Sequence, residues 1–150
     1  MQPFVFAFLM FAMLTMLANA QEQQPGWVLR ERDEVPIASY NAADGSTLLS
    51  AGCDSATGEL VLYRATRSAM ETGRLTIIMA TGSRALQAST ATQESPGVIA
   101  RTPADTTLAA EMATAATITF QFPDEAPAGG LAVPVGTELR QIVDSCASSR

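Results

Sequence analysis

The chain contains only two cysteines, Cys53 and Cys146, and whether they are joined constrains its fold more than any other feature. A bond between them would close a loop of about 93 residues. By reducing the entropy of the unfolded chain, such a closure would stabilise the folded state by about 4–5 kcal/mol, less any strain. That value rivals the whole net stability of a small domain. Disulfides persist in oxidising compartments, so the question becomes whether the protein is exported.

The first 20 residues predict export. A nearly unbroken apolar run extends from Phe4 to Leu17, and it is followed by a small-x-small site that signal peptidase would cut between Ala20 and Gln21. The alternative is an uncut membrane anchor, but a spanning helix needs about 20 apolar residues and this run is shorter. We therefore expect residues 1–20 to be a cleaved signal peptide. The mature protein would be periplasmic or secreted, with no stable membrane insertion.

An exported chain with two cysteines predicts a Cys53–Cys146 disulfide, the alternative being two free buried thiols. The pair is too far apart in sequence to form a CxxC redox motif. No free cysteine is therefore expected to do chemistry in the mature protein.

Composition narrows the possible functions. The net charge is −6, which argues against nucleic acids and anionic membranes as partners. All nine basic residues are arginine, and the chain has neither histidine nor lysine. Ser-His, Cys-His and Ser-Lys nucleophile pairs, Schiff bases and histidine metal ligands are thereby excluded. We expect a protein that is not an enzyme and has no catalytic, cofactor-binding or metal-binding residues. Abundant Ala, Arg and Gly without Lys suggest a GC-rich bacterial genome, and hence the periplasm.

Hydrophobic alternation and turn signals predict a single β-rich domain over residues 27–146, after a polar lead-in at 21–26 and before a tail at 147–150. Pro36 places its strand at a sheet edge. The expected class is α+β, mainly β: an antiparallel hairpin meander, either a sandwich or a partly open barrel. The strands are expected at Trp27–Arg32, Val35–Tyr40, Thr47–Cys53, Glu59–Thr66, Arg74–Thr81, Arg84–Thr90, Gly97–Thr102, Thr117–Phe122 and Leu131–Val135.

Two short helices are predicted in the C-terminal third. Asp105 is the expected N-cap of the first, and Thr137 caps the second. In the second helix, apolar residues recur at i, i+3, i+4 and i+7, which gives one buried stripe that includes Cys146. Its polar residues, Arg140 among them, are expected to face water. The disulfide would then staple this helix onto the sheet.

Few side chains indicate a binding site. Arg64, Arg67 and Arg74 flank a predicted hairpin and form a possible contact surface, since arginine is the usual partner of carboxylates and phosphates. The alternative is a solvated turn. Trp27, the only tryptophan, is either a ligand platform or an aromatic cap on the core. The acidic pairs Asp33/Glu34 and Asp124/Glu125 are either acid–base or calcium candidates or solvated loop charges.

The layout of Trp27, Cys53, the Leu60–Leu62 and Leu75–Ile77 strands and the ending from Pro134 to Cys146 resembles that of small exported proteobacterial envelope proteins. These include envelope proteins associated with type VI secretion and those named after an invasion-associated locus. The resemblance implies a secreted β-rich domain with a terminal cysteine pair and no established enzyme activity. It supplies no functional residues.

The expected function is therefore contact with another envelope protein. One alternative is a small inhibitor or ligand-binding module that uses a loop such as Met70–Gly73 or Ala91–Gly97 as its probe. Another is a carboxylate-based hydrolase, for which only carboxylates, tyrosine and arginine are available. A rigid protruding loop would favour the inhibitor, and a cleft with two inward carboxylates would favour the hydrolase.

Overall fold

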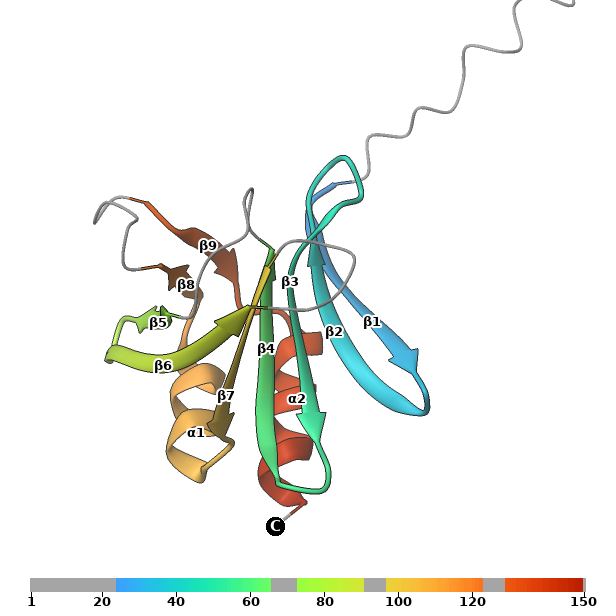
Figure 1. Ribbon diagram of the computed structural model, residues 1–150, viewed down its shortest axis with the longest axis vertical. Helices are drawn as coiled ribbons and strands as arrows, with labels where there is room; N and C mark the ends of the chain where they lie inside the picture. The colour runs from blue at the N-terminus through green and yellow to red at the C-terminus, as the bar shows by residue number, and fades with distance from the viewer. Residues whose placement is uncertain (1–23, 66–72, 91–96, 123–128, 150) are drawn as a thin grey trace, which may run out of the picture.

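A computed structural model describes residues 24–65, 73–90, 97–122 and 129–149, and in them the chain forms one antiparallel sheet with two helices against it (Figure 1). The spatial order of the strands is β1-β2-β3-β4-β7-β6-β5-β8-β9. The mainly β class with two C-terminal helices is confirmed, and the sheet is not closed into a barrel. The elements are β1 (Gly26–Arg32), β2 (Val35–Asn41), β3 (Thr47–Asp54), β4 (Glu59–Ala65), β5 (Gly73–Met79), β6 (Gly82–Thr90), β7 (Gly97–Pro103), α1 (Thr106–Thr114), β8 (Thr117–Gln121), β9 (Leu131–Pro134) and α2 (Thr137–Ser148).

The strand order departs from a simple meander at β4. The predicted hairpin between the strands at Glu59–Thr66 and Arg74–Thr81 is wrong. β4 pairs with β7 along its whole length, and β5 lies two strands beyond β7. The β6–β7 pairing that joins the two halves of the sheet covers only three residue pairs. Alternation in a sequence shows which residues share a face, and it does not show which strands are neighbours.

Pro36 does not mark a sheet edge, since β2 lies between β1 and β3. Its strand tolerates the proline because pairing with β3 begins only at Ile37. Pro36 thus sits at the strand's start, where the missing N–H removes no bond to β3.

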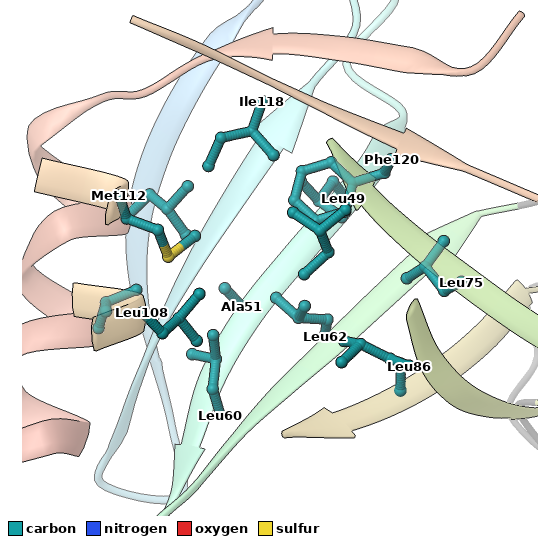
Figure 2. Close-up of a cluster of buried hydrophobic side chains, with 14 of the residues drawn as sticks. Leu49, Ala51, Leu60, Leu62, Leu75, Leu86, Leu108, Met112, Ile118 and Phe120 are labelled. Carbon is teal, nitrogen blue, oxygen red and sulfur yellow. The ribbon is translucent and has the colours of Figure 1, made fainter. Parts of the chain in front are cut away.

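One face of the sheet is buried, and residues from both halves of the sheet meet there in a single core. Figure 2 shows side chains of β3, β4, β5, β6, β8 and α1 converging on this cluster. Ile118, Phe120 and Phe122, the alternate apolar residues of the predicted Thr117–Phe122 strand, are all buried. Leu108 and Met112 bring α1 into the same cluster. The sheet therefore curves so that its own second half covers the part of the apolar face that the helices leave open.

The stapled C-terminal helix is confirmed. Leu139, Ile142, Val143 and Cys146 are all buried, and α2 packs against β1 to β4. The Cys53–Cys146 disulfide joins α2 to β3, with the two Cα atoms 5.3 Å apart. In Figure 1, α2 lies behind β3 and β4.

Details of the helix ends differ from expectation. Asp105 caps α1 as predicted, accepting the amide of Leu108 at 2.7 Å. The N-cap of α2 is Gly136, and Thr137 is its first helical residue. Arg140 does not face water freely: it is half-buried, and its Nη2 donates to the carbonyl of Ala115 at the end of α1 at 3.3 Å. The expected 147–150 tail is helical up to Ser148.

Trp27 connects the two edge strands of the sheet. Its indole Nε1 in β1 donates to the carbonyl of Pro134 in β9 at 2.7 Å, and its ring meets Tyr40 edge-to-face. The same ring lies so close to Gly136 that a Cβ there would be 2.6 Å from Cδ1. Trp27 is thus a cap on the core, and it holds the first strand against the junction between β9 and α2.

Ile142→Ala is expected to lower the free energy of unfolding by about 2–5 kcal/mol, because it removes a fully buried side chain and leaves a cavity. Gln141→Ala, at the neighbouring exposed position, should change it by no more than about 0.5 kcal/mol. Chemical denaturation with the disulfide intact measures both. Equal midpoints would contradict the burial of the α2 stripe.

Gly136→Ala is expected to destabilise the protein because its methyl group would collide with the indole of Trp27. The same substitution in a Trp27→Ala background removes the collision, so the two changes should be non-additive, with a coupling of about 0.5–3 kcal/mol. A double-mutant cycle of denaturation midpoints measures this. Strict additivity would show that the indole does not pack on Gly136.

Candidate functional site

The three arginines of the predicted contact surface are not brought together as a described surface. Arg64 is 8% exposed and belongs to the buried face of β4, so its inclusion in an exposed patch is wrong. Arg74 is exposed on β5, at the start of a strand in the other half of the sheet. Arg67 lies outside the described residues, as do most of the Met70–Gly73 and Ala91–Gly97 loops.

The buried guanidinium of Arg64 lies over an aromatic ring. Its guanidinium carbon lies 4.3 Å from the centroid of Phe122, in the distance range of a cation–π contact. Leu60 and Leu62, which precede it on the same face of β4, are completely buried. The alternation that predicts buried leucines also predicts a buried Arg64. Charged residues are mostly exposed, however, so the residue type predicts that Arg64 lies on the surface.

Three of the described carboxylates, those of Asp44, Asp54 and Glu111, serve local structure. Asp54 accepts from Arg101 at 2.9 Å and caps the β3–β4 turn, and these hydrogen bonds hold its pKa below the usual value. The hydroxyl and amide of Ser46 similarly lower the pKa of Asp44. Glu111 pairs with Arg84 at 2.9 Å. Asp44-Gly45-Ser46 is thus a hairpin turn, as its sequence predicts.

No group of three metal-ligating side chains occurs among the residues that the structure describes. In the same part of the chain, no helix has the length and apolar content needed to cross a membrane. Asp124 and Glu125 lie outside the described residues, and so do Ala20 and Gln21 at the predicted cleavage site.

The most exposed segment of the described chain is the β1–β2 hairpin. Its seven consecutive residues from Leu29 to Val35 are all exposed, the longest such run in the described ranges. The run includes both of the large apolar residues that are exposed there, Leu29 at 39% and Val35 at 37%. In Figure 1 the tip of this hairpin stands apart from the helices and from the β3–β4 turn.

The hairpin turn is tight and its backbone is strained. Arg32 pairs with Val35, so Asp33 and Glu34 form a two-residue loop. Both have positive φ, 52° and 64°, as a type I′ turn requires, although such turns favour Asn-Gly. They are the only positive-φ residues other than glycine in the described ranges. The Asp33/Glu34 pair is thus a loop of charges at an exposed tip.

Charges on β1 are arranged by face. Arg30 and Arg32 alternate with Leu29 and Glu31, so the two arginines share one face of the strand. No ion pair of Arg30 or Arg32 occurs within the described part of the chain, whereas Arg84 and Arg101 are both paired. Among the described residues β1 pairs only with β2, and its other side is an edge of the sheet.

The sequence already contained a signal for this hairpin. Two strand patterns separated by two residues indicate a tight hairpin, but Asp-Glu lacks the glycine that would identify a type I′ turn. That β1 is an edge strand depends on long-range pairing, which local patterns do not reveal. The sequence therefore predicts only two strands and an acidic pair in this segment.

No protein family, no curated protein sequence and no solved structure matches the chain.

Glu34→Gly is expected to raise the free energy of unfolding by about 0.5–1 kcal/mol. A left-handed conformation costs a residue with a Cβ about 1–2 kcal/mol, and glycine's larger loss of backbone entropy on folding offsets part of that gain. Glu34→Ala removes the same charge and keeps the strain, so it serves as the control. Denaturation midpoints measure both, and equal stability of the two variants would contradict strain at this tip.

Proposed function

We propose that this protein is an exported, non-enzymatic component of the bacterial cell envelope that acts by contact with another envelope protein. The observation that supports contact is the β1–β2 hairpin, an exposed sheet edge whose Arg30 and Arg32 have no ion pair in the described part of the chain. An open strand edge offers N–H and C=O groups to another chain, so it is a natural place of contact. The Cys53–Cys146 disulfide is compatible with an oxidising compartment.

An inhibitor is the second candidate, and the same hairpin favours it. A two-residue loop at the end of two paired strands is a short, tightly connected probe of the kind that could enter a cleft in another protein. The two candidates differ in what the partner is: an enzyme whose activity falls on binding, or a structural protein of the envelope.

Export is tested by mass spectrometry of the protein from fractionated cells of its native host. We expect a periplasmic chain that begins at Gln21, with the N-terminal glutamine cyclised in part of the sample. A mature pool that retains Met1, or a protein found only in the cytoplasm, would overturn the localisation.

Contact is tested by placing a photo-crosslinking amino acid at Val35 and, as a control, at Gln141, which is exposed on α2. We expect one dominant envelope protein to be crosslinked from Val35 and not from Gln141. Assaying that partner with and without the protein separates the inhibitor from the structural role. Identical crosslinking from both positions would contradict a hairpin-centred contact.

A further inference from the structure

We propose that the open edge of β1 binds an extended segment of its partner as a further antiparallel strand, and that the partner's residues opposite Arg30 and Arg32 are acidic. This inference rests on the proposed contact function and adds the mode of binding and the chemistry of the partner. Addition of a strand to an exposed sheet edge is an established mode of peptide recognition, in which main-chain hydrogen bonds supply affinity and alternate side chains supply specificity.

The register of the hairpin shows which backbone groups are available. Arg32 and Val35 flank the two-residue loop and therefore exchange hydrogen bonds with each other. Antiparallel bonding alternates, so the N–H and C=O groups of Leu29 and Glu31 point away from β2. No strand pairs with that side of β1 in the described residues.

The two faces of β1 require different side chains on the partner strand. Paired residues of neighbouring strands point to the same face, so a strand added here would place two of its alternate residues beside Arg30 and Arg32. Carboxylates at those positions would neutralise two arginines that have no ion pair in the described chain. On the other face, the intervening residues would meet Glu31 and the exposed Leu29, which calls for a basic and then an apolar side chain.

A second copy of the chain fits this edge less well. Antiparallel pairing of two β1 strands over their full length would centre on Leu29, and it would bring Arg30 of one copy diagonally next to Arg30 of the other. Like charges in neighbouring positions oppose pairing. The charges that protect the edge from self-association thus select a partner of complementary pattern.

The probe is a capped peptide, Glu-Arg-Glu-Val-Thr-Val, whose residues lie in order opposite Arg32 to Trp27 when it runs antiparallel to β1. The matched control is Arg-Glu-Arg-Val-Thr-Val. Titration of the oxidised protein, followed by NMR with amide hydrogen exchange, is expected to show about tenfold tighter binding of the probe than of the control. The amides of Leu29 and Glu31 should become protected from exchange on binding.

Two kinds of variant test the mechanism. Glu31→Pro removes an outward N–H and leaves the β1–β2 bonds intact, so it should abolish binding, whereas Glu31→Ala should retain it within about threefold. The double variant Arg30→Glu, Arg32→Glu should reverse the preference between the two peptides. Denaturation midpoints close to that of the unmodified protein verify that each variant is folded.

The proposal is overturned if the two peptides bind equally, if neither binds, or if binding survives in Glu31→Pro. It is also overturned if sedimentation of the protein alone shows a dimer that Glu31→Pro dissociates, because the edge would then pair with a second copy. Crosslinking from Val35 to an envelope protein, with no binding of either peptide, would reject strand addition and leave the proposed contact function standing.

Discussion

Burial of one continuous apolar face is the constraint on which the rest of the structure depends. The sheet has nine strands, but the helices that pack on it have only nine and twelve residues. They cannot cover such a sheet, so the sheet covers itself: Leu75 and Phe120 from one half join the same cluster as Leu49 and Leu62 from the other. The short β6–β7 pairing is the place where the two halves change direction. The hydrogen bond from Trp27 to Pro134 joins the two ends of the curve, and the Cys53–Cys146 bond fixes α2 to β3 within it.

Much of this fold could be predicted from local patterns. Alternation in the Thr117–Phe122 strand and the stripe that ends at Cys146 identify buried faces, because the periods of strand and helix are fixed by backbone geometry. Asp105 marks a helix start because its side chain bonds a free amide. The pairing of β4 with β7 could not be predicted, since nothing in either strand specifies its neighbour. The edge position of β1 depends on long-range pairing in the same way.

The candidate site was harder to predict than the fold. The charge of Arg64 predicts an exposed position, whereas the residue is buried with its guanidinium over the ring of Phe122, which is distant in sequence. The exposed hairpin could not be identified as a surface before its neighbours were known: Trp27–Arg32 and Val35–Tyr40 read like the other strands. What distinguishes them is that pairing with β3 begins only at Ile37, so the tip from Arg32 to Val35 has no third strand beside it and stands apart from the helices and from the β3–β4 turn.

The position of the disulfide divides the chain into two parts with different mechanical properties. Residues 53 to 146 form a covalent ring that contains β4 to β9, both helices and most of the core, whereas β1, β2 and nearly all of β3 lie outside it. A force applied through a partner bound at β1 would separate these strands from the sheet one after another. Unfolding would stop at Cys53, because the disulfide closes the ring there. The protein could therefore yield under tension by extending its N-terminal strands and then recover, with the ring serving as the template on which they pair again.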